Sequence, residues 1–253
     1  VESNNRNFYR FLFRYQEQIG KDTFKDLKYF KVWGRYNDYI SSFSENIYLY
    51  NENLEKLLNA NVFPDGQVYM LPQNFFGPVQ AFKDWNEFFQ KFNVKLYEAT
   101  TFIKTEIIPK VKDLEKHFDN YDAFEEGETP TELYLQKKSA NAQLWAYIHG
   151  VLPKFSGEEI KAIKKQLGAL VVFTSEHCTT KALKECWLSK SYTDDDTVDG
   201  LVDKFPDVAN QVTFVSADYL GNHLSQSKWR DLFTGCSGKT NEKEFVNLLK
   251  DKI

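Results

Sequence analysis

The sequence predicts a mixed α/β fold made of two diverged copies of one unit, each with a small, mostly three-stranded sheet and packed helices. Short runs rich in β-branched and aromatic residues alternate with amphipathic helical patterns. The order helix, strand, strand, strand, helix occurs twice, and an acidic stretch with Gly and Pro separates the two occurrences. We therefore predict a first unit at residues 1–118, an acidic linker at 119–130 and a second unit at 131–253.

The elements of the first unit follow from the spacing of its apolar residues. Phe8, Leu12, Tyr15 and Ile19 recur at intervals of three or four residues, which predicts a helix over 6–19. The other predicted elements are strands at 27–33, 45–50 and 67–71 and helices at 51–59 and 81–92, followed by a longer helical stretch that Pro109 interrupts.

The second unit repeats this order after a long predicted helix at 131–152. Ser156 and Glu159 have the spacing of a capping box, and an apolar stripe that follows them predicts the next helix. The remaining predicted elements are strands at 169–174, 185–189 and 211–216, a polar loop with a short helix at 192–205, and helices at 227–233 and 241–253.

Residues 67–89 and 211–233 align without a gap, at a constant offset of 144 residues. The identical pairs are Gln67 and Gln211, Val68 and Val212, Gly77 and Gly221, Trp85 and Trp229, and Phe89 and Phe233. We interpret the aligned stretch as a strand, a glycine at which the chain reverses, and a helix whose Trp packs back on the sheet. A fixed offset indicates that each copy is one structural unit.

Composition and charge argue against two classes of partner. The 32 basic and 36 acidic residues are interleaved, giving a net charge of −4, without the basic stripe that a phosphate backbone requires. No apolar run approaches the roughly 18 residues that a membrane-spanning helix needs. We therefore expect neither nucleic acid nor a membrane as partner. Aromatic residues make 16% of the chain, which predicts aromatic-rich cores, with an exposed aromatic face for a partner as the alternative.

The cysteines and the start of the chain bear on its origin. Cys178, Cys186 and Cys236 are odd in number and lack CxxC spacing, so we expect reduced thiols in the cytoplasm instead of disulfide bonds. The chain starts at Val1 and its one Met is Met70, whereas a natural gene product normally begins with Met. We therefore expect a segment cut from a larger protein.

The second copy resembles segments that lie downstream of the ATPase domain in sacsin-like proteins. Those segments carry a strand, then Ser-x-x-Tyr-Leu, then Trp-x-x-Phe-Phe. The matching residues here are Val215, Ser216, Tyr219, Leu220, Trp229 and Phe233, and more loosely in the first copy Leu71, Phe75, Phe76, Trp85, Phe88 and Phe89. The aromatic strands at 46–50 and 185–189 also look like the strand that precedes this element in those proteins.

Sacsin-like proteins are large proteins with a heat-shock-chaperone-type ATPase domain of the gyrase, chaperone and histidine kinase class. The resemblance implies that this chain is a non-catalytic structural or protein-interaction segment of such an ATPase. Its partners would be other domains of the parent chain or protein clients, with no cofactor. The ATP site of that class, an Asn-bearing helix followed by a DxGxG loop and a Gly-rich lid, is not found in the sequence.

The alternative is a hydrolase or nucleotide-binding domain that uses the 234–240 loop or a carboxylate cluster. Gly238-Lys239-Thr240 ends this loop like a phosphate-binding loop, but the first Gly of that motif would fall at Phe233. Asp194, Asp195 and Asp196 lack the alternating ligand spacing of a calcium loop. The soft ligands do not have zinc-finger spacing: His177, Cys178, Cys186, His223 and Cys236. We nominate no catalytic, cofactor-binding or metal-binding residue.

Overall fold

A computed structural model describes residues 2–19, 32–33, 39–40, 46–71, 82–92, 94–205, 209–236, 238–239, 245–247 and 250. It confirms the mixed α/β class, because helices are combined with three two-stranded sheets in this part of the chain. The chain divides into two compact units: unit 1 comprises 1–59 and 63–101, and unit 2 comprises 60–62 and 102–253.

None of the helices in the described ranges combines the length and the apolar character required to cross a bilayer.

The division between the units differs from the predicted one. It falls between Thr101 and Phe102, so the acidic stretch at 119–130, predicted as a linker, lies within unit 2. Two aromatic residues of this stretch anchor it: the rings of Tyr121 and Phe124 lie 5.0 and 5.1 Å from the ring of Tyr134. Tyr121 and Phe124 therefore attach the otherwise exposed acidic stretch to helix α7 (Glu132–Val151) of unit 2.

Unit 1 contains the predicted helices and strands, in several cases shortened. The elements are α1 (Glu2–Arg14), β1 (Val32–Trp33), β2 (Tyr39–Ile40), β3 (Ile47–Tyr48), α3 (Glu52–Asn59), β4 (Tyr69–Met70), α4 (Phe82–Gln90) and α5 (Ala99–Phe102), whose last residue belongs to unit 2. β1 pairs antiparallel with β2, and β3 pairs parallel with β4 on one side and with Lys95 on the other. Most of the predicted strand at 27–33, and Phe75, Phe76 and Gly77, lie outside the described residues.

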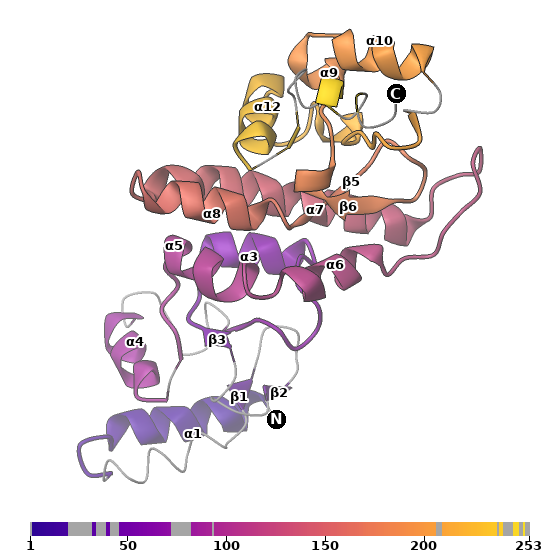
Figure 1. Ribbon diagram of the computed structural model, residues 1–253. Coiled ribbons are helices and arrows are strands. Elements are labelled where there is room, and N and C mark those ends of the chain that lie inside the picture. Colours follow the sequence, from indigo (N-terminus) through magenta and orange to yellow (C-terminus); the bar gives the residue numbers. More distant parts are fainter. Residues whose placement is uncertain are drawn as a thin grey trace. The chain divides into compact units, whose positions relative to one another are not determined.

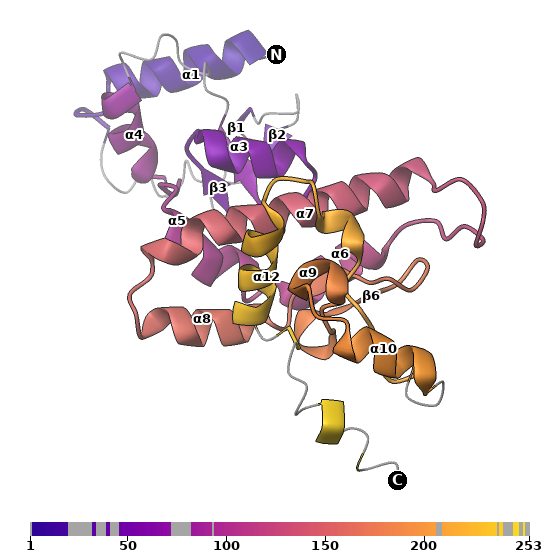
Figure 2. The same cartoon turned by 90° about the horizontal axis from the view of Figure 1, so that it is seen from above.

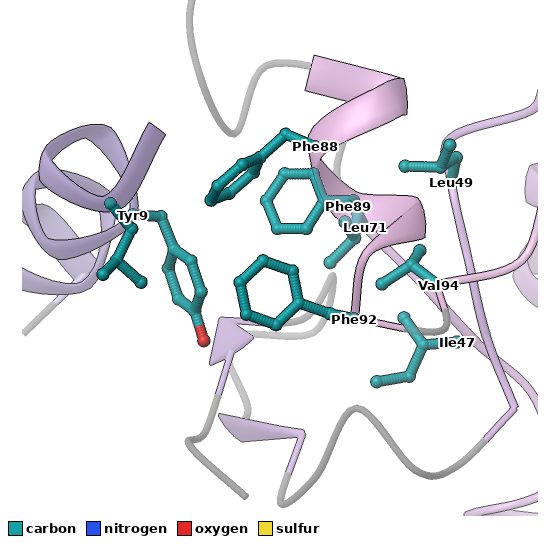
Figure 3. Close-up of a cluster of buried hydrophobic side chains, with 9 residues drawn as sticks. Tyr9, Ile47, Leu49, Leu71, Phe88, Phe89, Phe92 and Val94 are labelled. Carbon is teal, nitrogen blue, oxygen red and sulfur yellow. The ribbon is translucent and has the colours of Figure 1, made fainter. Parts of the chain in front are cut away.

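The core of unit 1 is largely aromatic, as the composition predicts. Phe88, Phe89 and Phe92 come from α4 and the turn after it, and Tyr9 of α1 faces them (Figure 3). The ring of Tyr9 lies 5.9 Å from that of Phe89 and 6.4 Å from that of Phe92. Burial raises the pKa of the Tyr9 phenol above its ordinary value. Aliphatic side chains complete the cluster: Leu12, Ile47, Leu49, Leu71 and Val94.

Unit 2 is built around the long helix α7 (Glu132–Val151), which packs against β5 and against α6 (Figure 1). Thr131 caps its first turn, because the Thr131 side chain accepts a hydrogen bond from the Tyr134 N–H. The other helices and strands are α6 (Val111–Asp119), α8 (Glu159–Leu167), β5 (Val171–Phe173), β6 (Thr180–Ala182), α9 (Lys190–Thr193), α10 (Thr197–Lys204) and α12 (Gln226–Gly235). Shorter turns are the π-helix η2 (Ile103–Ile107) and the 3-10 helices η3 (Leu152–Lys154), η4 (Leu183–Glu185) and η5 (Ala217–Tyr219).

The sheet of unit 2 departs from the predicted set of three strands. β5 and β6 form an antiparallel ladder, and single bridges continue the sheet from Thr174 to Val215 and from Trp187 to Phe214 and Lys239. The predicted strands at 185–189 and 211–216 are therefore reduced to short bridged segments. Most of the helix predicted at 241–253 lies outside the described residues.

A set of backbone hydrogen bonds in unit 1 recurs in unit 2. In both units a central segment pairs parallel with a segment on either side, around Tyr48 in unit 1 and Trp187 in unit 2. The N–H groups of Leu71, Leu49 and Lys95 donate to the carbonyls of Tyr48, Lys95 and Ile47 at 2.9, 2.9 and 2.8 Å. The counterparts are the N–H groups of Val215, Leu188 and Lys239, which donate to the carbonyls of Trp187, Lys239 and Cys186 at 2.9, 3.0 and 2.9 Å.

The flanking pieces of the two units also correspond. Lys95 and Lys239 are 144 residues apart, and their ammonium groups lie 5.4 and 5.6 Å from the centres of the Tyr48 and Trp187 rings. The turn after each Trp-bearing helix closes in the same way. The Val94 N–H donates to the Phe89 carbonyl at 3.3 Å, and the Gly238 N–H donates to the Phe233 carbonyl at 2.8 Å.

Candidate functional site

A groove of about 410 Å³ lies in unit 2 between helix α7 and the loop that follows the Val215 bridge. One wall is a face of α7, and the other is the loop at 217–223. The lining residues are Pro130, Tyr134, Leu135, Lys138, Ser139 and Ala142 on the helix side, and Asp218, Tyr219, Asn222 and His223 on the loop side. Each of the α7 residues lies three or four positions from another of the set, as Leu135 does from Lys138 and Ser139, so they share one face of the helix.

Helix α7 has its buried side turned away from this wall. Leu144, Trp145 and Ile148 are fully buried, and the Trp145 indole N–H donates to the Val171 carbonyl of β5 at 3.1 Å. Leu135 precedes Leu144 by nine residues, which is about half a revolution around the helix axis beyond two full turns. Leu135 therefore faces the groove and stays 50% exposed.

Tyr219 ties the loop at 217–223 to helix α7 and strand β5. Its side chain is 1% exposed, and its hydroxyl donates to Asn141 Oδ1 at 2.6 Å and accepts from the Phe173 N–H at 2.9 Å. Asn141 in turn donates through Nδ2 to the Val171 carbonyl at 3.1 Å. Burial raises the pKa of the Tyr219 phenol well above its ordinary value, so it stays protonated.

An ion pair joins the two walls. The Lys138 ammonium of α7 pairs with Asp218 Oδ2 of the loop, and the Ser216 hydroxyl donates to the same oxygen at 2.9 Å. These contacts, with Lys138 first, lower the pKa of Asp218. Lys138 also lies 5.3 Å from the centre of the Tyr134 ring, so its ammonium is held by the loop and by the helix.

Gly221 and Trp229, which match Gly77 and Trp85 in the alignment, shape the C-terminal end of the loop at 217–223. Gly221 has φ of +81°, as predicted for a residue at which the chain reverses, and His223 follows with φ of +55°. The Asn222 side chain donates to the Asp218 carbonyl at 2.9 Å, and the Trp229 indole N–H donates to the Asn222 carbonyl at 3.0 Å. Trp229 is fully buried, which confirms its predicted place in the core.

Gly238 and Lys239 of the 234–240 loop, which the alternative prediction uses, contact neighbouring segments of unit 2. Helix α12 ends at Gly235, and a Cβ atom added at Gly238 would lie 2.8 Å from the Phe233 carbonyl oxygen. Glycine at 238 is therefore required by this close approach. The Lys239 backbone bridges to Trp187, over whose ring its ammonium lies.

The acidic run at 194–196 borders the start of helix α10. Asp195 accepts hydrogen bonds from the Thr197 N–H at 2.9 Å and from the Thr197 hydroxyl at 2.6 Å, and these bonds lower its pKa. Asp194 has φ of +61° and accepts from Gln226. Asp195 therefore has its partner within the turn itself, whereas the partner of Asp194 comes from helix α12.

The candidate soft ligands are dispersed. Burial raises the pKa of the Cys186 and Cys236 thiols to about 12, whereas Cys178 is partly exposed. The His177 Nε2 atom lies 2.6 Å from the carbonyl oxygen of Phe124. Throughout the described ranges, no three His, Cys, Asp or Glu side chains are grouped so that they could hold a metal ion.

Sequence reasoning singled out Ser216, Tyr219 and Trp229 but missed Lys138 and the groove itself. One signal for the groove was present, since Leu135 falls on the side of the 131–152 helix opposite the stripe of Leu144 and Ile148. An ion pair between residues 80 positions apart left no local pattern.

The geometry offers a braced groove with an apolar floor and a rim of hydrogen-bonding groups. Such an arrangement can hold an apolar side chain of a bound segment and orient its backbone by polar contacts. No protein-family model, no curated protein and no solved structure matches the chain.

Proposed function

We propose that the chain is a non-catalytic protein-interaction segment of a larger chaperone-like ATPase, and that it holds a segment of a client or of another domain in the groove beside α7. The observation that carries the proposal is Leu135, a large apolar side chain left half-exposed on the wall of an open cavity. The volume of about 410 Å³ falls within the roughly 300–1,000 Å³ of typical ligand pockets.

The bracing of the groove supports this proposal. Tyr219 ties the loop to α7 and β5, and the pair between Lys138 and Asp218 ties the rim of the loop to the helix. A wall held in place before binding loses little conformational entropy when a partner arrives. Residues that carry the resemblance to sacsin-like segments supply this bracing, namely Ser216, Tyr219 and Trp229.

The proposal includes the duplication of one unit. It is supported by the matching hydrogen bonds around Tyr48 and Trp187 and by the lysine that lies over each of these rings. An experimental structure that covers residues 72–81 tests the duplication. It should show a positive φ at Gly77, as at Gly221, and a negative φ at Gly77 would contradict the match of the two turns.

The proposal keeps the cytoplasmic location expected from the sequence, in agreement with three free cysteines.

A peptide-display experiment tests the groove. A phage library of random 12-residue peptides is panned on the purified chain, and enriched peptides are measured against Leu135→Glu and, as matched control, Leu133→Glu. Leu133 is 37% exposed in the same helical turn but does not line the groove. We expect Leu135→Glu to weaken binding at least tenfold and Leu133→Glu to leave it unchanged. Failure to enrich any peptide, or equal effects of the two substitutions, would contradict the proposed function.

An ATP titration tests the non-catalytic part of the proposal. Saturable micromolar binding of ATP that is lost in Lys239→Ala would overturn it in favour of a nucleotide-binding domain.

A further inference from the structure

We infer that the groove beside α7 accepts a basic protein segment, in which an apolar side chain lies against Leu135 and flanking Lys or Arg residues meet the acidic rim of the groove. The inference rests on the proposed function and names the chemistry of the partner. The acidic rim consists of exposed carboxylates: Asp122, Glu125, Glu126, Glu128 and Glu132.

The charge of this rim is one-sided. From Phe118 to Gln136 the chain contains no Lys or Arg. Within the described part of the chain, none of the five carboxylates takes part in an ion pair. Their negative charge is therefore available to a partner.

The rim is attached to the groove and not merely adjacent in sequence. The ring of Phe124 packs on that of Tyr134, which lines the groove, and the Thr131 hydroxyl donates to the Asp122 carbonyl at 3.3 Å. Pro130 itself lines the groove. The loop that carries the rim projects beyond the N-terminal end of α7 in both views (Figures 1 and 2).

The interior of the groove does not offset this charge. Lys138, the lysine on its helix wall, is already paired with Asp218 of the loop wall. A partner that enters along α7 therefore meets an apolar surface at Leu135 and a negative potential toward the acidic rim. Such a field attracts Lys and Arg and repels an acidic segment or a nucleic acid.

Fluorescence anisotropy with synthetic peptides tests the inference on the full chain. The probes are a labelled 12-residue peptide with a central Leu and four Lys, its twin with four Glu, and a Lys peptide in which Ser replaces the Leu. At 50 mM NaCl we expect the Leu–Lys peptide to bind at least tenfold more tightly than either of the other two. The preference over the Glu twin should shrink in 500 mM NaCl, because exposed charges are screened within a few Å at that ionic strength.

Variants locate the binding surface. The triple variant Glu125→Gln, Glu126→Gln, Glu128→Gln should bind the Leu–Lys peptide at least fivefold more weakly than the parent chain does. A matched triple variant at exposed carboxylates elsewhere in unit 2, Glu158→Gln, Glu185→Gln and Asp203→Asn, should leave its affinity within twofold. Leu135→Ser should weaken binding and Leu133→Ser should not.

Several results would overturn the inference. They are equal binding of the Lys and Glu peptides, equal effects of the two triple variants, an unchanged affinity when Ser replaces the central Leu, or no binding at all. If acidic peptides are enriched by display and lose binding in Leu135→Glu, the basic partner is wrong while the proposed function stands.

Discussion

Tyr219 shows how a single hydroxyl group can connect distant parts of unit 2. It receives a hydrogen bond from the Phe173 backbone and gives one to Asn141, which also binds the Val171 carbonyl. Every group in this network is buried, and each would remain unsatisfied if its partner were removed.

Replacing Tyr219 with Phe should destabilise the protein by about 1–3 kcal/mol, because a buried donor and a buried acceptor lose their partner without gaining water. Tyr121→Phe is the matched control, since that hydroxyl donates to the Cys178 carbonyl from a partly exposed side chain. Urea unfolding should show the smaller loss for Tyr121→Phe. An equal loss for the two variants would argue against the Tyr219 network.

Helices α4 and α12 share one arrangement of aromatic rings. Each helix stacks its Trp on a Phe one turn later, Trp85 on Phe89 at 6.0 Å and Trp229 on Phe233 at 5.2 Å. They differ in burial, because Trp229 is fully buried whereas Trp85 is partly exposed and stacks on Phe13 at 4.0 Å.

Trp229→Ala should lower the free energy of unfolding by about 3–5 kcal/mol, because the burial of the ring is lost and a cavity is left behind. Trp85→Ala should lower it by less. Lys239→Ala should cost only about 0.5–1 kcal/mol, the typical value of a cation–π contact near the surface. Thermal melts of the three variants check this order. A Trp229→Ala protein that melts like the parent but no longer binds the displayed peptides would show that the ring serves recognition and not the core.

Carboxylates in both units link the stability of the whole molecule to pH. Hydrogen bonds from Thr101 and Thr100 lower the pKa of Glu98 in unit 1 to about 2, and Lys104 and Ser156 lower the pKa of Glu159 in unit 2 to about 2. Each group favours the folded state above the unfolded pKa of 4.5, and that contribution is lost as the pH falls toward 2. The raised pKa of Asp119, caused by burial, acts in the opposite direction.

We therefore expect the urea midpoint to fall between pH 5 and pH 3. The urea midpoint of the double variant Glu98→Gln, Glu159→Gln should fall less steeply over this interval than that of the parent. Because both side chains are exposed, the difference should be modest. Parallel curves for parent and variant would assign the acid sensitivity to other groups.

Local pattern predicted the elements whose signal lies within one turn or one helix. The Trp-bearing helices and the long helix at 131–152 occur close to their predicted positions, as α4, α12 and α7. The helix predicted at 6–19 occurs earlier in the chain, as α1 at Glu2–Arg14, so Tyr15 and Ile19 lie beyond its end.

The reversal at Gly221 was also predicted, since only glycine adopts its positive φ at no cost. Half of the predicted capping box is present, because the Glu159 carboxylate accepts hydrogen bonds from the backbone N–H and the hydroxyl of Ser156. The other half is not, since α8 begins at Glu159 without a side-chain cap.

The pattern of apolar and turn residues therefore predicted the mixed α/β class, the main helices and the burial of Trp229. The length of the strands, the place of the acidic stretch and the groove depend on packing between segments that are far apart in the chain. A five-residue strand predicted at 185–189 is confined to a bridge at Trp187, because η4 ends at Glu185 and α9 begins at Lys190. The groove depends on Lys138 meeting Asp218, and a contact across 80 residues is set by packing that periodicity does not record.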